Sequence, residues 1–259
     1  MFMQHRVTLH DGAEIAYHDL GSGPPVLLIH GFVGTARTHM GLLIDDLSRD
    51  HRIIAPDLRG YGASRPPNRT FPPDFYQRDA TDMAELLDLI QPGPAVVMGF
   101  SDGGESALIL AASRPDVLRG VVAWGVSGVM SQAMVNAVQD WLPATAWVER
   151  RPSWRQEIIE LHGSEQFEAI IEGWVHAAQA IAASGGDICF QTASRIRCPA
   201  LLINGDGERN NLPSDVQRLA ATIPNCRLEF VTNSGHAIQE DQPEELIRLI
   251  RQFLAQLAL

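Results

Sequence analysis

The sequence predicts an α/β fold in which a mostly parallel sheet is covered by helices. Short, nearly continuous apolar runs of the kind buried on both faces of a sheet recur along the 259 residues, and segments with helical periodicity separate them. A third observation is the GxSxG pattern at residues 99–103, where an apolar run passes directly into a helix-forming run. The length fits one large domain with an insertion, or two small domains.

The elements follow one another in an order that supports this fold. Residues 7–9 and 15–17 flank a turn signal and predict a β-hairpin. In the rest of the chain, strands are predicted at residues 26–29, 52–55, 95–98, 121–124, 200–203 and 228–231, and helices at residues 37–48, 79–90, 101–113, 214–222 and 243–257. Because ligands bind beyond the carboxyl ends of the strands in such sheets, we expect the functional site at that edge.

A segment of about 70 residues between Trp124 and Pro199 interrupts the alternation and shows helical periodicity without a convincing strand. It predicts a helical insertion, and four of the five tryptophans fall within it. These side chains either form the core of the insertion or line an apolar pocket beneath a lid, and both roles can hold for different tryptophans. The candidates for the pocket are Trp141, Trp147 and Trp174.

Composition and charge narrow the class of partner. A net charge of −11 disfavours nucleic acids and anionic membranes, which are recognised through basic patches, so a small-molecule substrate is expected. No apolar stretch is long enough to span a bilayer, and the first ten residues lack a secretory pattern, which predicts a cytoplasmic location. We expect a monomer or a homodimer. The spacing of Cys189, Cys198 and Cys226 predicts neither a disulfide framework nor a metal site.

Ser101 and His236 form a candidate catalytic pair. Gly99 and Gly103 leave room for a serine on a sharp turn between a strand and a helix, whose first N–H groups can stabilise an oxyanion. A serine hydroxyl needs a general base, which in turn needs an orienting acid. His236 follows the last predicted strand and precedes the last helix, so its loop lies at the same sheet edge as Ser101.

Several motifs together resemble the α/β-hydrolases, a family in which nucleophile, acid and histidine occur in this chain order. Residues 99–104 are similar to the nucleophile elbow, residues 30–32 to the HGx oxyanion loop, residues 57–64 to the DxxGxGxS loop, and residues 234–236 to the histidine loop. The resemblance covers nearly the whole chain. It implies an α/β-hydrolase core at residues 1–126 and 198–259, with a helical cap at residues 127–197.

The same resemblance assigns roles to further residues. The backbone N–H groups of Phe32 and Asp102 would form the oxyanion hole, and His30 would brace a loop rather than catalyse. Relatives usually carry an aspartate three residues after a glycine at the end of the penultimate strand. After Gly205 that position is held by Glu208. Glu208 is therefore the favoured acid, and Asp206, one residue after the glycine, is the alternative.

The side chain of Asp102 has two possible roles. It either caps the helix that follows Ser101 or faces the pocket and attracts a cationic group, as the resemblance to GxSDGG-bearing hydrolases of amino-acid esters implies.

These observations predict a serine hydrolase that cleaves carboxylic esters of small molecules without a cofactor or metal. Carbon–carbon bond hydrolysis, lactone opening and peracid formation of the haloperoxidase kind use the same fold and triad and remain alternatives. A ligand receptor with slow turnover is the alternative from another class.

Overall fold

The computed structural model describes residues 4–257, whose centre is an eight-stranded sheet with the order β1-β2-β4-β3-β5-β6-β7-β8. β1 (Gln4–Thr8) and β2 (Glu14–Leu20) form the predicted hairpin, and β2 pairs antiparallel with β4. The remaining neighbours are all parallel. They are β3 (Pro25–Ile29), β4 (Arg52–Pro56), β5 (Ala95–Phe100), β6 (Leu118–Trp124), β7 (Ala200–Gly205) and β8 (Cys226–Val231). The predicted α/β fold with a mostly parallel sheet is confirmed.

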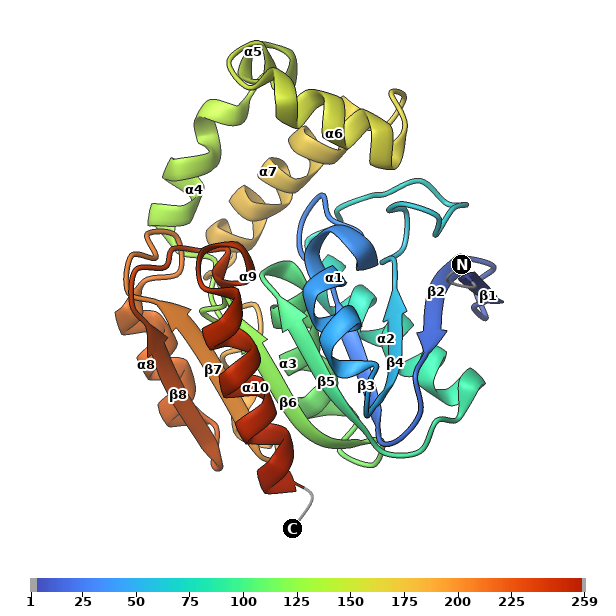
Figure 1. Ribbon diagram of the computed structural model, residues 1–259. Helices are drawn as coiled ribbons and strands as arrows, with labels where there is room; N and C mark the ends of the chain where they lie inside the picture. Colours follow the sequence, from blue (N-terminus) through green and yellow to red (C-terminus); the bar gives the residue numbers. More distant parts are fainter. Residues whose placement is uncertain (1–3, 258–259) are drawn as a thin grey trace.

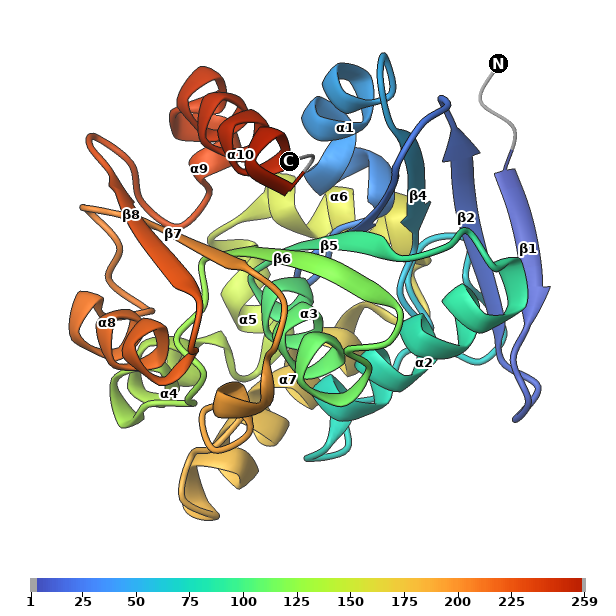
Figure 2. The same cartoon turned by 90° about the horizontal axis from the view of Figure 1, so that it is seen from below.

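Helices cover both faces of the sheet, as Figure 2 shows from below. One face carries α1 (Ala36–Leu47) and α10 (Pro243–Leu257); the other carries α2 (Phe75–Ile90), α3 (Asp102–Ser113) and α8 (Pro213–Thr222). Two apolar clusters follow this division, one containing Met40 and Leu249 and the other Met83 and Leu110. The alternating side chains of each central strand contribute to both clusters, which explains the continuous apolar runs in the sequence.

Two elements differ from the sequence-based expectation. α2 begins at Phe75 rather than at residue 79, because Phe75 and Tyr76 are buried and extend its apolar face by one turn. β8 was expected to be buried on both faces, but it is an edge strand with mostly half-buried side chains, and Phe230 is 39% exposed. An edge strand pairs on one side only, which leaves part of it open to solvent.

The long segment between β6 and β7 is a helical insertion. It contains α4 (Gln132–Val138), the 3₁₀ turn η1 (Gln139–Trp141), α5 (Ala144–Glu149), α6 (Pro152–His162) and α7 (Phe167–Ala183). Figure 1 shows these helices beyond the carboxyl ends of the parallel strands. A second 3₁₀ turn, η2 (Ala193–Arg195), packs against α3 and so returns the chain to the sheet layer before β7.

The base of the insertion is tied to α3 through Glu105. Its buried carboxylate accepts hydrogen bonds from the N–H groups of Ser127 and Gly128, both at 2.9 Å, where the insertion begins. The Cys189 thiol, where the insertion ends, donates to the other carboxylate oxygen at 3.2 Å. Both connecting segments are therefore anchored to the helix that follows Ser101.

Two further expectations concern the membrane and the cysteines. None of the helices within residues 4–257 is long and apolar enough to cross a bilayer. Cys189, Cys198 and Cys226 all carry free thiols.

Candidate active site

Ser101 lies on the sharp turn between β5 and α3. Its backbone has φ 54° and ψ −123°, a region that residues with side chains rarely adopt. A Cβ at Gly99 would overlap the carbonyl of Gly103, and a Cβ at Gly103 would overlap the carbonyls of Ile29 and His30. The two glycines thus allow α3 to pack tightly beneath the turn, and the turn holds the serine hydroxyl out at the carboxyl edge of the sheet.

A chain of hydrogen bonds connects Ser101, His236 and Glu208. The hydroxyl of Ser101 lies 3.0 Å from Nε2 of His236, and Nδ1 of the same ring lies 2.5 Å from Oε2 of Glu208. The three side chains come from the ends of β5, β8 and β7, which meet at one sheet edge. A Glu208 carboxylate at this position keeps the proton on Nδ1 and leaves Nε2 free to accept the serine proton.

The carboxylate that contacts His236 is that of Glu208 and not that of Asp206. The side chain of Glu208 is buried, and its second oxygen accepts hydrogen bonds from the N–H groups of Arg209 at 2.8 Å and Asn210 at 2.7 Å. Burial by itself would raise the pKa of Glu208, but His236 and the backbone donors outweigh it and hold that pKa below its usual range. Asp206 is exposed at the start of the same turn.

The loop that carries Glu208 is fixed from below by Asn211. Its amide nitrogen donates to the carbonyl of Gly125 at 2.8 Å. The same nitrogen lies 3.5 Å from Nδ1 of His236, a contact too long for a firm hydrogen bond. Asn211 thus anchors the loop to Gly125, and the shorter of the two contacts of His236 Nδ1 is the one with Glu208.

The loop after β3 packs directly against the serine. A Cβ added at Gly31 would lie 3.0 Å from the Cβ of Ser101, and the next residue, Phe32, lines the same pocket as Ser101. Asp102 is the first residue of α3, where backbone N–H groups have no carbonyl of the same helix to bond. Phe32 and Asp102 therefore flank Ser101 from two elements, in places suited to stabilising negative charge.

Two histidines hold this loop, of which His30 is buried and His39 is half-buried. His30 accepts from the N–H of Leu58 through Nε2 and donates through Nδ1 to the Gly31 carbonyl, both at 2.8 Å. His39 accepts from the N–H of Gly31 through Nδ1 at 3.2 Å. Burial lowers the pKa of each ring to about 3, so both rings are neutral near pH 7.

The carboxylate of Asp102 is buried and is not among the residues that line the pocket with Ser101, in contrast to the pocket-facing position considered from the sequence. Two side chains bond it instead. Tyr76 of α2 donates its hydroxyl proton to one oxygen at 3.0 Å, and Trp174 of α7 donates its indole N–H to the other at 2.9 Å. Burial raises the pKa of Asp102 to about 6, although the hydrogen bond from Tyr76 opposes the rise. Asp102 thus connects α3 to α7 of the insertion.

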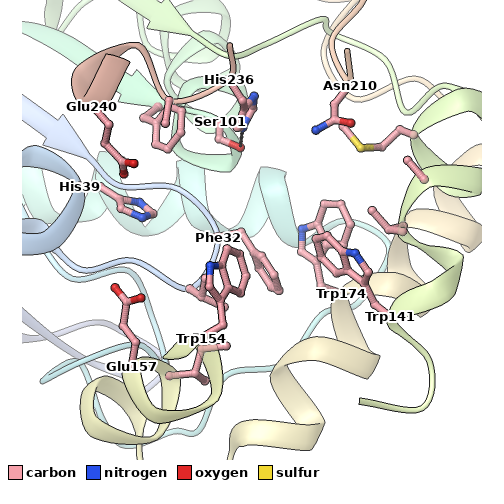
Figure 3. Close-up of a pocket in the computed structure, with 17 residues that line it drawn as sticks. Phe32, His39, Ser101, Trp141, Trp154, Glu157, Trp174, Asn210, His236 and Glu240 are labelled. Carbon is pink, nitrogen blue, oxygen red and sulfur yellow. Dashed lines mark hydrogen bonds between the residues drawn. The ribbon is translucent and has the colours of Figure 1, made fainter. Parts of the chain in front are cut away.

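A pocket of about 470 Å³ opens above Ser101 and His236. Figure 3 shows Trp141 and Trp174 on one side of the view, His39, Glu157 and Glu240 on the other, and Phe32 and Trp154 between them. The volume falls within the range typical of small-molecule sites. Among the described residues that line the pocket there is no lysine or arginine, and at least two carboxylates face it.

The tryptophans of the insertion divide between the two roles considered from the sequence. Trp141 and Trp174 line the pocket, as does Trp154. Trp147 is 3% exposed and lies in an apolar cluster of the insertion, stacked on Trp141 with the ring centroids 4.9 Å apart. It supports the pocket wall from behind.

Sequence reasoning did not identify several lining side chains, namely His39, Trp154, Glu157, Asn210 and Glu240. His39 lies nine residues after His30, and its spacing resembles that of an ordinary residue on an amphipathic helix. Glu157 and Glu240 are exposed residues of helices, a setting in which glutamate is usual. No group of three or more potential metal ligands occurs within residues 4–257.

Comparisons with known proteins give the family and support the fold. Residues 26–249 match the pattern of the alpha/beta hydrolase family. The human protein Serine hydrolase BPHL is 29% identical over 94% of this chain and 84% of its own length. A 2-hydroxy-6-oxo-2,4-heptadienoate hydrolase of Pseudomonas putida is 28% identical over 96% of both chains. The structure of a thermophilic esterase from Thermogutta terrifontis superposes with a TM-score of 0.76 at 24% identity, over 98% of this chain and 99% of that one.

Proposed function

Since the chain belongs to the alpha/beta hydrolase family, we propose that it cleaves carboxylic esters of small molecules through an acyl-enzyme on Ser101. The observation that carries the proposal is the continuous series of hydrogen bonds from Glu208 through His236 to Ser101. Within the family this arrangement supports hydrolysis, and a serine nucleophile suits an acyl group.

In the first half-reaction, Nε2 of His236 takes the proton of the Ser101 hydroxyl while the oxygen attacks the ester carbonyl. The negative charge that develops on the carbonyl oxygen is stabilised by the N–H groups of Phe32 and Asp102. The tetrahedral intermediate collapses as His236 returns its proton to the departing alcohol. Glu208 keeps the imidazole oriented and stabilises its cationic form during the transfer.

In the second half-reaction, His236 removes a proton from water, which attacks the acyl group on Ser101. The same two N–H groups stabilise the second oxyanion, and Ser101 leaves with the proton from His236. The products are a carboxylic acid and an alcohol, and the reaction needs no redox step.

The insertion, taken as residues 127–197, is proposed as a cap that selects the substrate. Trp141 and Trp174 provide flat apolar surfaces opposite the reacting hydroxyl, while Glu157 and Glu240 add negative charge at the pocket wall. Aromatic faces and carboxylates both attract cations. Esters that carry an amino group are therefore proposed as preferred substrates, with Asp102 adding its charge from behind Trp174.

Substitution of Asp102 by asparagine tests this preference. We expect kcat/KM to fall about tenfold more for an α-amino ester than for the neutral ester of the same size, because the change removes about 1.4 kcal/mol of attraction for a cation. The measurement is kcat/KM for matched ester pairs with both proteins. Equal losses for both esters would show that Asp102 acts only through Tyr76 and Trp174.

The preference should also depend on pH. Asp102 has a pKa of about 6, so it becomes neutral below that pH and ceases to attract an amine. An α-amino group with an ordinary pKa of about 7.7 stays protonated there. We expect the ratio of kcat/KM for amino and neutral esters to fall as the pH drops through about 6. The Asp102→Asn protein should give a flat ratio over the same range, and a flat ratio in the wild type would contradict the role of Asp102.

A second candidate activity is hydrolysis of a carbon–carbon bond, which is favoured by the similarity to the 2-hydroxy-6-oxo-2,4-heptadienoate hydrolase. A panel of esters with different acyl lengths, α-amino esters, a lactone and a dienoic diketone separates the candidates. We expect the esters to be turned over fastest. Faster cleavage of the diketone would favour the second activity, and labelling of Ser101 by a fluorophosphonate with almost no turnover of any substrate would favour a receptor.

A further inference from the structure

The oxyanion loop holds a strained turn next to the reacting serine. Residues 31–34 form a turn closed by a 3.2 Å hydrogen bond from the N–H of Gly34 to the carbonyl of Gly31. Val33, the third residue of this turn, has φ 53°. A β-branched residue is disfavoured in this left-handed region, so the conformation persists only where neighbouring groups hold it. Phe32, whose N–H is the proposed oxyanion donor, is the residue immediately before Val33.

One of the groups that hold the turn comes from the insertion. His162 is the last residue of α6 and is fully buried. Its Nε2 lies 2.8 Å from the carbonyl of Val33, and its Nδ1 accepts a hydrogen bond from the N–H of Gly62 at 3.0 Å. One imidazole therefore connects three segments that are far apart in the sequence: the insertion, the oxyanion loop and the loop after β4.

These contacts fix the protonation of the ring. Because the Gly62 N–H donates to Nδ1, that nitrogen carries no proton, and Nε2 must carry the proton that bonds the Val33 carbonyl. Burial lowers the pKa of His162, which agrees with a neutral ring. The ring also packs against Tyr61, with centroids 5.0 Å apart, so its orientation is restricted.

The backbone of residue 162 is held independently of its side chain. Its carbonyl accepts hydrogen bonds from Arg65 at 2.5 Å and from the side-chain amide of Gln166 at 2.8 Å. The oxygen of the Gln166 side chain in turn accepts from the N–H of Arg69 at 2.7 Å. The end of α6 thus remains attached to the loop after β4 when the imidazole is replaced.

We propose that His162 is a positioning residue through which the seated insertion holds the oxyanion loop, by its hydrogen bond to the Val33 carbonyl. The proposal rests on the proposed function, because it assigns the Phe32 N–H to the oxyanion. Its consequence is that the insertion shapes the pocket and also sets the position of a transition-state donor. Loss of the bond to Val33 lets the strained turn relax, which moves the Phe32 N–H and weakens transition-state binding more than substrate binding.

Two substitutions separate the two hydrogen bonds of the ring. Asparagine at position 162 places its carbonyl oxygen near the place of Nδ1, so it keeps the bond from Gly62 and loses the bond to Val33. Glutamine is longer by one methylene, so its amide nitrogen reaches the place of Nε2 and keeps the bond to Val33. Glu165→Gln, an exposed change in the same loop that breaks only the ion pair with Arg65, is the control.

The readouts are kcat and KM for a turned-over ester and the inhibition constant of an alkyl trifluoromethyl ketone, which forms a tetrahedral oxyanion on the serine. For His162→Asn we expect kcat to fall and the inhibition constant to rise by about tenfold each, less than is typical for removal of an oxyanion donor itself, with KM nearly unchanged. For His162→Gln and Glu165→Gln, both kcat and the inhibition constant should stay within about threefold of the wild-type values.

Equal losses of kcat and of ketone affinity in His162→Asn and His162→Gln would overturn the proposal. A His162→Asn protein with a raised KM and an unchanged inhibition constant would also overturn it. Thermal unfolding of each variant shows whether a loss reflects folding. If His162→Asn does not fold, retention of kcat and of ketone affinity by His162→Gln supports the proposal, and their loss in a folded His162→Gln overturns it. Failure of the proposed function is distinct, because the wild type itself would then neither turn over esters nor bind the ketone.

Discussion

Replacing Ser101 with alanine should lower kcat for ester hydrolysis by about 10⁴- to 10⁶-fold, the range expected when a covalent nucleophile is removed. The hydroxyl of Ser101 is the only part of the side chain that the substitution removes, and its hydrogen bond is to His236. Without it, His236 can still activate water, and the proposed oxyanion donors remain in place, so a small residual rate is expected. The measurement is kcat at saturating ester, with protein purified free of host esterases.

A matched control is available on the same helix. Ser113→Ala removes an exposed hydroxyl that bonds only carbonyls of α3, so it should leave kcat unchanged. Both variants should unfold at nearly the same temperature as the wild type, because neither creates a cavity in the core. Ester hydrolysis by the Ser101→Ala protein at the wild-type rate would contradict the proposed mechanism.

Replacing Glu208 with glutamine should give the second largest effect, a fall in kcat of about 10³- to 10⁴-fold. Glutamine has nearly the same shape but lacks the charge that stabilises the imidazolium. Its amide can also present a donor to His236 and so favour the wrong tautomer of the ring. Glu208→Asp keeps the charge but moves the carboxylate away from His236 by the length of one methylene, and we expect kcat to fall by about 10²-fold.

Asp206→Asn is the control for these variants, because Asp206 is an exposed carboxylate in the same turn. Its kcat should stay within about twofold of the wild type, as expected for a surface charge that meets no reacting atom. If Asp206→Asn lost activity while Glu208→Gln kept it, the acid would have been assigned to the wrong residue.

The strands of the parallel core were predictable because each is a compact apolar run. The runs at residues 26–29, 95–98 and 200–203 lie within β3, β5 and β7. The exposed edge of β8 was not predictable in this way, since an apolar run has the same appearance whether one or two neighbours pair with it. The positions of Ser101 and His236 at one sheet edge were predictable because each follows a strand, and the resemblance to a known family supplied the expected place of the acid between them.

The choice between Glu208 and Asp206 depended on the path of the turn after β7. In the structure Asp206 is exposed at the start of the turn, and Glu208 contacts the His236 ring. Two backbone N–H groups donate hydrogen bonds to the second carboxylate oxygen of Glu208. Asp206 and Glu208 are only two positions apart, and the local sequence does not determine which of them the turn directs towards His236. The resemblance to a known family favoured Glu208, whose carboxylate lies next to His236 in the structure.

The contacts of Asp102 and His162, on which their proposed roles depend, could not be read from the sequence because they are long-range. Asp102 is bonded by Tyr76, 26 positions earlier, and by Trp174, 72 positions later. His162 bonds Val33, 129 positions away. Both connect the insertion to the sheet layer. Helical periodicity predicted the presence of the insertion but not the angle at which it is seated.

The most direct test of an acyl-enzyme on Ser101 is to trap it. Excess wild-type protein is mixed with a slowly deacylated ester, quenched in acid within the first turnover, digested and analysed by mass spectrometry. The proposed mechanism predicts the mass of the acyl group on the peptide that contains Ser101, formed together with a burst of released alcohol, and neither in the Ser101→Ala protein. Release of both products at the wild-type rate with no acyl group on Ser101 at any time would contradict it.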